Sequence, residues 1–588
     1  MKKHLIIPIF VLSVSSIFSC NTSKTQIRTE TYEQKDGICN FKLGQKFQTN
    51  KSEYSGYFEI AENLFINELP GIFGNSFDLS FKIASPTGVL KYKINEGKDK
   101  KEFATYVNPI EIKVLDDKNL ENYPFTTAVN AIHDEAKDKR GISYDYIENV
   151  QKNGHYYLNN RQNVVQISYE DKANKQSYSA TLTYLINSDI DFTKIPVVSI
   201  NVDYEDCMGT KGFYNNFLED IEKRANLEVF DYKNNEYFSR NSKIKIGGNT
   251  SAGFPQKTLN LNFNKDENGD KNKKVSQNIY DGTTRQCDDE VISKITRFRL
   301  HNGGHCFESY TGINDALLQS FARGMNCGSS AFRPCITYIN GEYWGYYSIR
   351  EHYSDVYFED NYGVDKDDVC LVENFFGWTF DDGNNKNWKK YIANLEDYLL
   401  KDFSNDTVYQ KFIDEYIDVN SLIDAIIVNA YSNNIDYIGN FNNFKMWKTQ
   451  TIDSSKPYYD GKWRFVLHDI DLGHCGHRVN FLEEDVNYSY TLFPMFKALL
   501  KNKNFVNSFI NRTEEVMKTY LNKKRCLKIM DDIINEVKPF KKESYLRWGK
   551  DNLFLAAWEK NLDTFRGQIK LRDSNFLKEV KETLQKYL

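Results

Sequence analysis

The chain has 588 residues and a mass of 68.8 kDa, so at least two domains are expected, because single hydrophobic cores stop growing at ~250–300 residues. Hydrophobic residues make up 40% of the chain and aromatic residues 15%, which excludes a disordered protein. The net charge is −5, from 76 Lys and Arg against 81 Asp and Glu, which argues against bulk binding of nucleic acid, and we expect no nucleic-acid partner.

The N-terminus has the pattern of an export signal. Two lysines precede an apolar run over residues 5–18, and a small serine stands directly before Cys20. The run is shorter than the ~20 apolar residues of a membrane-spanning helix, and the four residues ending at Cys20 resemble a bacterial lipobox. We therefore predict a signal peptide over 1–19, lipidation of Cys20 and a flexible tether over 20–38. The protein is then an exported lipoprotein, held through its lipid to a bacterial membrane at the cell envelope or surface; plain secretion and an uncleaved anchor are the alternatives.

The segment over 39–190 has the pattern of a β-sandwich. Apolar and polar residues alternate over 90–94, 110–114 and 178–184, and several short strands at regular spacing are typical of that architecture. Within it, residues 89–114 resemble the chitobiase C-terminal-like module, a fibronectin-type sandwich. That resemblance implies a spacer or a carbohydrate-associated unit.

A second domain is expected over 195–588. It begins with a buried strand over 196–200, and strands, loops and helices then alternate to about residue 484. Over 490–588 apolar residues recur at helical spacing, with Pro539 separating two helical halves. The expected fold class is α+β: an all-β sandwich, followed by a mixed domain with a helical C-terminal part.

The densest group of unusual polar residues lies around a predicted hairpin. A helix is predicted over 421–431, followed by strands over 444–448 and 463–467. Because paired antiparallel strands place the start of one beside the end of the other, polar residues that flank the hairpin should meet at one end of a sheet.

The polar residues in question are Asp436, Asn440 and Asn443 before the hairpin, and Asp469 and Asp471 after it. Carboxylate and amide oxygens suit Mg²⁺ or Mn²⁺, and a further carboxylate can orient a hydroxyl, which is the minimum equipment for phosphoryl transfer. Their order parallels the catalytic and metal-binding loops of protein kinases. Turn capping by Asn and Asp is the alternative interpretation.

Four blocks of sequence carry a resemblance to a known family. They are residues 246–257 (IGGNTSAGFPQK), 300–305 (LHNGGH), 340–351 (NGEYWGYYSIRE) and 436–471. With these blocks the chain over roughly 195–588 resembles the CotH kinase family, atypical secreted protein kinases of the spore-coat-protein-H type. The resemblance implies a protein-kinase-like fold and phosphorylation of Ser- or Thr-containing exported proteins, with ATP and Mg²⁺ or Mn²⁺ as cofactors.

The resemblance also implies roles for the polar residues. Asp436 matches the catalytic base that accepts the proton of the substrate hydroxyl. Asp469 matches the acid that holds the metal on the phosphates, with Asp471 as the alternative. Asn443 matches the metal-binding asparagine, with Asn440 as the alternative.

Two further residues are expected at the nucleotide. Lys257 follows a Gly-containing turn and is the expected phosphate contact. Glu351 stands at the end of the 340–351 block, where it either faces the nucleotide or caps a surface pair.

Departures from the family pattern leave other functions open. The family commonly has Arg or His where Gly247 stands, and Arg where His301 and Asn314 stand. Since lost cations weaken nucleotide binding, a catalytically silent CotH-like protein of surface adhesion or envelope assembly is one alternative. Another is a metal-dependent hydrolase, whose zinc ligands would come from His468, Asp469, His474, Cys475 and His477.

Overall fold

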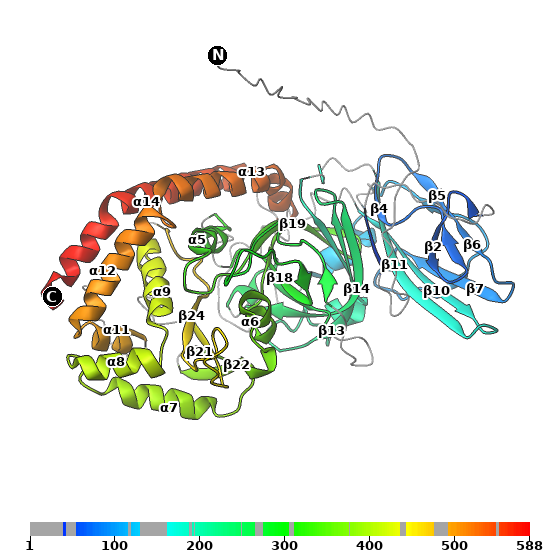
Figure 1. The fold of residues 1–588 in the computed structure, drawn as a ribbon. Helices are drawn as coiled ribbons and strands as arrows, with labels where there is room; N and C mark the ends of the chain where they lie inside the picture. Colours follow the sequence, from blue (N-terminus) through cyan, green and yellow to red (C-terminus); the bar gives the residue numbers. More distant parts are fainter. Residues whose placement is uncertain are drawn as a thin grey trace, which may run out of the picture.

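The computed structural model describes most of the chain beyond the N-terminus. The described residues are 39–42, 54–115, 119–129, 161–186, 191–192, 194–248, 250–264, 274–304, 311–374, 377–434, 443–475, 492–548 and 552–588. Figure 1 shows a small β unit at one end, a larger β structure in the middle, and helices around a small sheet at the other end. Strands dominate the N-terminal part and helices the C-terminal part, which confirms the α+β class.

The N-terminal unit consists of short strands in three small sheets. The strands are β2 (Phe58–Ala61), β3 (Leu64–Ile66), β4 (Gly71–Phe73), β5 (Phe77–Leu79), β6 (Phe81–Ile83), β7 (Gly88–Ile94), β8 (Ala104–Thr105), β9 (Ile110–Ile112), β10 (Asn163–Asp171) and β11 (Gln176–Ile186). The largest sheet has the order β4-β11-β10-β7-β8; the others are β2-β3-β6 and β5-β9. The predicted strands over 90–94 and 178–184 are confirmed within β7 and β11, whereas the strand predicted over 110–114 ends at Ile112.

The middle of the molecule is a closed β-barrel. Its strands are β12 (Val197–Asn201), β13 (Lys223–Asp231), β14 (Glu236–Gly247), β15 (Thr258–Asn262), β18 (Arg297–His301), β19 (Phe332–Ile339) and β20 (Glu342–Arg350), with β1 (Cys39–Lys42) at an edge. The order is β14-β13-β12-β19-β20-β18-β15, and β15 pairs back onto β14, which closes the sheet. The sequence predicts residues 39–42 within the sandwich, but β1 pairs with the first residues of β14 and therefore belongs to the barrel sheet.

Alternation of side chains directs one set of strand residues into an apolar interior and the other set to the outer face. Fully buried aliphatic residues from five strands fill the interior: Leu227, Ile244, Leu259, Leu300 and Ile349. Trp344 on β20 joins this core and is fully buried, as expected for a packed hairpin residue. Short elements lie between the strands: η2 (Leu120–Asn122), α3 (Tyr204–Met208), η3 (Thr250–Gly253), β16 (Val275–Ser276) and β17 (Lys294–Ile295).

Beyond the barrel lies a four-stranded antiparallel sheet with helices around it. The elements are α5 (Asn314–Ala322), α6 (Asp355–Tyr362), η4 (Lys366–Asp368), β21 (Val369–Asn374), β22 (Trp378–Gly383), α7 (Trp388–Leu399), α8 (Asp406–Glu415), α9 (Val419–Ser432), β23 (Phe444–Thr449) and β24 (Arg464–Leu467). The sheet order is β22-β21-β23-β24. The helix predicted over 421–431 is α9, which begins after the capping residue Asp418 and ends at Asn433 in the left-handed conformation (φ 51°).

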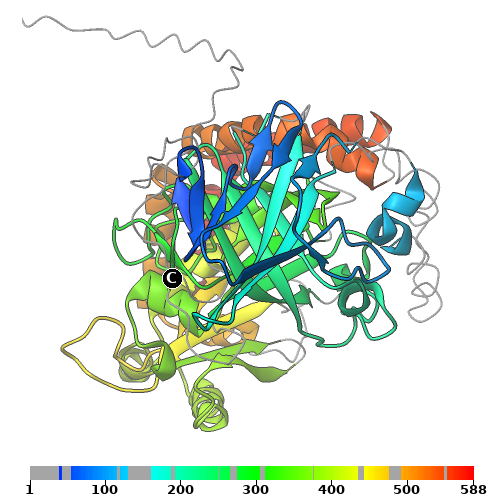
Figure 2. The same cartoon turned by 90° about the vertical axis from the view of Figure 1, so that its right-hand side faces the viewer.

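Helices complete the C-terminal part. They are α11 (Leu492–Leu499), α12 (Lys503–Lys518), α13 (Lys523–Arg547) and α14 (Asn552–Leu584), followed by η5 (Gln585–Tyr587). One of them, α13, packs against β19 and β20 of the barrel. Figure 2, viewed from the N-terminal unit, shows the orange and red helices running across one side of the strands. None of the described helices combines the length and hydrophobicity that a bilayer-spanning segment requires.

The prediction that Pro539 separates two helices is wrong, because α13 runs through it without a break. Packing against the rest of the protein offsets the backbone hydrogen bond that a proline removes, since Val537 and Phe540 on either side are buried. Near its end, α13 approaches the barrel closely: Tyr346 N–H donates to Ser544 Oγ at 3.1 Å. Gly345, with φ 95°, allows this approach, because a Cβ atom there would lie 2.8 Å from Ser544 Oγ.

Candidate active site

A row of polar side chains crosses the outer face of the barrel. Strand register aligns Lys245, Asn260, Arg299 and Arg350 across β14, β15, β18 and β20. Arg299 is half-buried, and its Nε donates to Asn260 Oδ1 at 2.9 Å. Within the described part of the chain its guanidinium makes no other hydrogen bond or ion pair. Arg299 is therefore a cation with donors to spare, the kind of group that binds phosphate.

The loop after β24 brings two carboxylates to this face. Asp469 has a left-handed backbone (φ 51°), and Asp471 is buried. Burial lowers the pKa of Arg299, and Asp469 is the acid that opposes this shift most strongly. Asp471 packs against Gly304, where a Cβ atom would collide with its carboxylate, so the approach requires a glycine.

Helix α5 holds this loop in place. Asp315 on its first turn accepts a hydrogen bond from Ile470 N–H at 3.1 Å and forms an ion pair with Arg350 at 2.8 Å. Burial would raise the pKa of Asp315, but the charge of Arg350 acts together with hydrogen bonds from Gln319 and Ile470 to hold the pKa below its usual value. Asp315 is therefore ionised and fixes the residue between Asp469 and Asp471. We call Arg299, Asp315, Arg350, Asp469 and Asp471 the Arg–Asp site.

The predicted hairpin is confirmed and borders the Arg–Asp site. Phe444 on β23 pairs with Leu467 on β24, so Asn443 stands opposite the beginning of the loop that carries Asp469. Asn443 is buried, and its backbone turns sharply (φ 57°). Asp469, Asp471 and Asn443 thus offer hard oxygen atoms of the kind that Mg²⁺ or Mn²⁺ prefers. Asp436 and Asn440 lie outside the described residues, and their roles stay predictions.

A family model described as CotH kinase protein matches residues 244–576, more than half of the chain. The chain belongs to the CotH kinase family. The match runs from β14 to α14 and includes the whole Arg–Asp site, whereas the N-terminal unit lies outside it. No curated protein matches the chain. The resemblance of residues 89–114 to a chitobiase C-terminal-like module stays a prediction.

His301 departs from the arginine that is common in CotH proteins, and the structure shows what it supplies instead. Burial lowers the pKa of His301 to about 3, despite the opposing charge of Asp315. The imidazole is therefore neutral at pH 7. Because Gly303 N–H donates to His301 Nδ1 at 3.2 Å, the ring proton sits on Nε2. His301 can donate one hydrogen bond to a ligand but adds no charge.

A second group of charges lies on β21, β22 and β23 and at His468, just after β24. Lys445 Nζ lies 3.1 Å from Glu373 and 2.6 Å from Asp381, and His468 Nε2 lies 3.5 Å from Glu373 Oε1. Burial would raise the pKa of Glu373, but the hydrogen bond from His468 and the charge of Lys445 hold it well below its usual range. This group is internally paired.

Lys257 does not join the Arg–Asp site in this structure. Its ammonium group is fully buried and donates to the carbonyl oxygens of Ala252 at 2.7 Å and Phe254 at 2.9 Å. It also lies 3.9 Å from the ring centroid of Phe217, in the barrel interior. Lys257 therefore supports the Gly-containing turn from within. Its contact with phosphate stays a prediction, and Arg299 is the cation that the fold presents on the outer face.

The partners of Glu351 among the described residues do not include Asp469. The carboxylate of Glu351 accepts hydrogen bonds from Ala331 N–H at 2.8 Å and Asn361 Nδ2 at 2.6 Å, and an ion pair with Arg323 at 3.4 Å completes its partners. Glu351 thus ties the end of β20 to α6 and to the end of α5. Glu351 therefore has a structural role in this fold, and its contact with a nucleotide stays a prediction.

The zinc ligands of the hydrolase alternative do not come together among the described residues. No group of three His, Cys, Asp or Glu that could hold a metal is found there. His474 is buried between the rings of Tyr431 and Phe565, at centroid distances of 5.2 and 5.0 Å. Burial lowers its pKa to about 3, so it behaves as a core aromatic residue. His477 lies outside the described residues.

Sequence reasoning missed Arg299. The signal was present as an alternation on β18, where Arg297, Arg299 and His301 are separated by Phe298 and Leu300. Such a strand has one apolar and one cationic face. The alternation could have identified a cationic sheet face before the fold was known, but not the acids that it meets.

Proposed function

We propose that the protein is a CotH-type protein kinase that transfers phosphate from ATP to Ser or Thr residues of exported or cell-surface proteins, with Mg²⁺ or Mn²⁺. Family membership supports the general class. The Arg–Asp site is the observation that supports ATP and a metal as ligands. In it, the Nε of Arg299 donates to Asn260, its terminal nitrogens have no hydrogen bond among the described residues, and Asp469 acts on its charge. Phosphoryl transfer requires this combination of cationic donors for phosphate and hard oxygen ligands for a metal.

Each residue of the site has a distinct task in this proposal. Asp469 and Asp471, with Asn443, would hold the metal, which when bound neutralises charge on the phosphates. Arg299 binds phosphate oxygens through its terminal guanidinium nitrogens. His301 donates its Nε2–H to an oxygen of the same ligand. Asp436 is assigned the acceptance of the substrate hydroxyl proton, on the family resemblance alone.

Nucleotide binding tests the site. A fluorescent ATP analogue is titrated into the chain that begins at Cys20, with Mn²⁺ or with chelator. We expect metal-dependent binding that falls on the order of tenfold in Arg299→Ala, as for loss of a charge-assisted hydrogen bond. Lys294→Ala, which removes an exposed cation five residues earlier in the chain, is the matched control and should bind like the wild type. Autophosphorylation with Mg²⁺ and with Mn²⁺ then tests transfer.

A catalytically silent CotH-like protein of adhesion or envelope assembly is the second candidate. It is favoured by the neutral state of His301, which supplies no charge where family members commonly have arginine. Absence of nucleotide binding under every metal condition would replace the kinase proposal with this one. Nucleotide binding without transfer of phosphate to any protein would also favour this candidate, because it would show that the catalytic step is missing.

We also propose that lipid on Cys20 attaches the mature protein to a membrane. Each buried CH₂ of an acyl chain contributes about 0.8 kcal/mol, so two or more chains dominate the partition of a hydrophilic protein. The wild type should partition with membranes or detergent, and Cys20→Ser should be released. Recovery of the wild type in the soluble fraction would exclude the lipid anchor.

A further inference from the structure

Strand β8 forms an open edge of the N-terminal unit. The sheet order β4-β11-β10-β7-β8 places it at one end, and residues 98–105 are all exposed. Within the described part of the chain, no strand pairs with the side of β8 that faces away from β7. An open edge of this kind presents unpaired backbone N–H and C=O groups, to which another strand can bind.

The pairing of β8 with β7 shows which backbone groups face outward. Tyr106 N–H donates to the carbonyl oxygen of Leu90 on β7 at 2.8 Å. Backbone groups of successive residues in a strand point alternately to its two sides, so those of Tyr106 face β7 and those of Thr105 face away from it. By the same alternation, Phe103 and Val107 direct their N–H and C=O groups away from the sheet. The edge thus offers three outward-facing residues.

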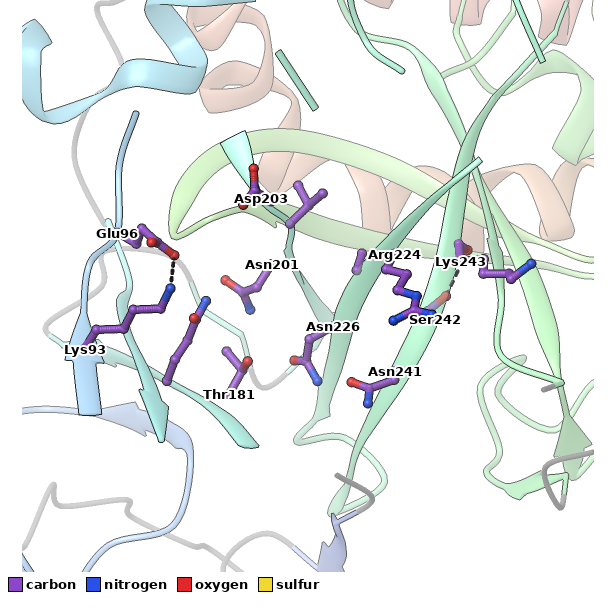
Figure 3. A pocket seen from close by; sticks show the side chains of 13 residues that line it. Lys93, Glu96, Thr181, Asn201, Asp203, Arg224, Asn226, Asn241, Ser242 and Lys243 are labelled. Carbon is purple, nitrogen blue, oxygen red and sulfur yellow. Dashed lines mark hydrogen bonds and ion pairs between the residues drawn. The ribbon is translucent and has the colours of Figure 1, made fainter. Parts of the chain in front are cut away.

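Two of these residues also carry exposed apolar side chains. Val107 is 77% exposed and Phe103 is 39% exposed, and the register places Val89, which is 45% exposed, beside Val107. At the other end of the edge, the Lys93 ammonium lies 5.0 Å from the ring centroid of Phe103. Lys93 also pairs with Glu96 at 2.5 Å, where both line a polar cavity between this unit and the barrel (Figure 3). The free part of the edge is therefore apolar.

A charged pair and a proline limit this apolar edge at its two ends. Lys101 and Glu102 precede it, and Pro109 follows it. Proteins commonly block edge-to-edge pairing with lysine and proline, but residues 103–107 (FATYV) contain neither and are mostly strand-forming types. Lys101 N–H is already bonded to Glu96 Oε1 at 3.0 Å, and Pro109 has no N–H to donate. Pairing at this edge is therefore confined to five residues.

We infer that a second copy of the chain pairs with this edge, so that two molecules share one continuous sheet. A two-fold axis at Thr105 places Phe103 of each molecule opposite Val107 of the other. The three pairs that result join only outward-facing residues, and such antiparallel pairs exchange both of their N–H···O=C bonds. The exposed apolar side chains of the two edges cover each other in the same step. The edge is thus complementary to itself.

The residues at the ends of the edge select this register. If the axis moves toward Val107, Pro109 comes to stand opposite Thr105 or Phe103 and removes a donor. If the axis moves toward Phe103, Lys101 comes to stand opposite Thr105 or Val107, and its N–H is already used. Only the axis at Thr105 leaves all three outward-facing residues with partners that can donate and accept.

The position of the barrel is compatible with such a pair. The barrel contacts one end of the sheet, where Gln162 N–H donates to Gly341 C=O at 2.8 Å and Lys100 pairs with Asp203 at 2.9 Å. The other end, at the hairpin between β10 and β11, points away from the barrel (Figure 1). Because the two copies of β8 run antiparallel, the two barrels lie at opposite ends of the shared sheet.

Sedimentation velocity measures the association. The chain that begins at residue 20 carries Cys20→Ser, so that no lipid contributes, and is studied from about 1 to 300 µM, since a pairing of five residues is smaller than the ~1,200 Å² of stable interfaces. We expect a reversible dimer that Val107→Glu weakens at least tenfold, because the new charge would stand against Phe103 of the second copy. Ile452→Glu is the matched control: Ile452 is 75% exposed but lies between β23 and β24, so this variant should dimerise like the wild type.

Disulfide trapping tests the register. Thr105→Cys should link the two copies in oxidised glutathione, because residues of a hydrogen-bonded antiparallel pair have Cα atoms about 5.5 Å apart, within the range of a disulfide. Ser177→Cys, at an exposed position of β11 in the same sheet, should not. Mass spectrometry of the linked peptides identifies the bonded residues.

Three outcomes would overturn the inference. A monomer at every concentration would leave the edge to an extended segment of another protein. A dimer that Val107→Glu does not weaken, or one that Thr105→Cys does not link, would place the contact elsewhere. Because Val107 is exposed, Val107→Glu should keep the melting temperature of the wild type, which excludes unfolding as the cause. ATP-analogue binding should also be unchanged, so the result is independent of the kinase proposal.

Discussion

The barrel presents two different polar surfaces to its neighbours. Toward the four-stranded sheet, outward-facing residues of β18 and β20 are arginines that meet Asp315 and Asp469. Toward the N-terminal unit, outward-facing residues of β12 and β13 include Asn201, Asn226, Arg224 and the buried Glu228, which accepts a hydrogen bond from the Thr183 hydroxyl. The first surface is built around an ion pair between an arginine and an acid, whereas the buried acid of the second surface is held by neutral donors. The same strand alternation thus produces two polar faces that treat a buried acid differently.

Glu228 makes the difference between the two surfaces clearest. Burial raises its pKa to about 7, although Thr183 and Tyr237 donate hydrogen bonds to it. In the Arg–Asp site, by contrast, Arg350 keeps the pKa of Asp315 below its usual value. A buried acid without a cation is protonated over much of the physiological range, and a buried acid with one is not. The neighbour, not the residue type, decides the charge.

Loss of the shared core should abolish both surfaces and is the largest expected effect. Trp344 is fully buried, its Nε1 donates to Tyr214 at 3.2 Å, and its ring meets that of Trp548 edge-on at 5.6 Å. Trp344→Ala should lower the free energy of unfolding by about 3–5 kcal/mol, as large-to-small core changes do. Thermal melting measures the loss, and Trp344→Phe should recover part of it. An unchanged melt would mean that Trp344 is not a core residue.

Breaking the ion pair of Asp315 should damage only the surface toward the four-stranded sheet. Asp315→Ala leaves Arg350 buried without its partner, which should cost about 3 kcal/mol of unfolding free energy. It also releases Ile470, so ATP-analogue affinity should fall. The double variant Asp315→Ala with Arg350→Met should regain stability but not affinity. If the double variant regained both, Asp315 would not position the metal-binding loop.

Glu228 should give the surface toward the N-terminal unit its own pH dependence. Its folded-state pKa is above the unfolded value, so the folded state binds the proton more tightly and stability falls as pH rises from about 4.5 to about 7. The expected fall is about 3 kcal/mol, and above pH 7 stability no longer changes from this group. Chemical denaturation at a series of pH values should show this fall in the wild type and not in Glu228→Gln. Glu170→Gln, an exposed acid on β10, should behave as the wild type does.

Asp469 and Asp436 should have separable roles, the first in nucleotide binding and the second in the transfer step. Asp469→Ala should lose metal-dependent ATP-analogue binding as well as turnover, because a metal ligand acts on the bound nucleotide. Asp436→Ala should keep most of the binding while turnover falls on the order of 10², as for positioned acid–base groups. Asp471→Ala shows whether Asp469 or Asp471 is the acid that holds the metal, because the stronger loss of metal-dependent binding identifies the ligand. Equal loss of binding in the Asp436 and Asp469 variants would contradict this division.

Local sequence determined the elements that carry the candidate site. Period-3.6 spacing over 421–431 specified helix α9, although its cap, Asp418, lies earlier in the chain than the sequence indicated. The apolar runs on either side of Gly461 specified the hairpin of β23 and β24. These patterns depend on neighbours within a few residues, so they can be recognised without the fold. The loop that carries Asp469 and Asp471 could therefore be placed at the end of the hairpin from the sequence.

Tertiary structure alone decided which cation faces these acids. Lys257 and Arg299 both lie on or beside barrel strands, but closure of the barrel turns Lys257 into the interior and Arg299 outward. Likewise, the register of three strands aligned Asn201, Asn226 and Asn241. The packing of α13 on β20 stabilises a continuous helix that includes Pro539. Each outcome depends on contacts between residues far apart in the chain, which strand closure and side-chain packing create and which no local pattern encodes.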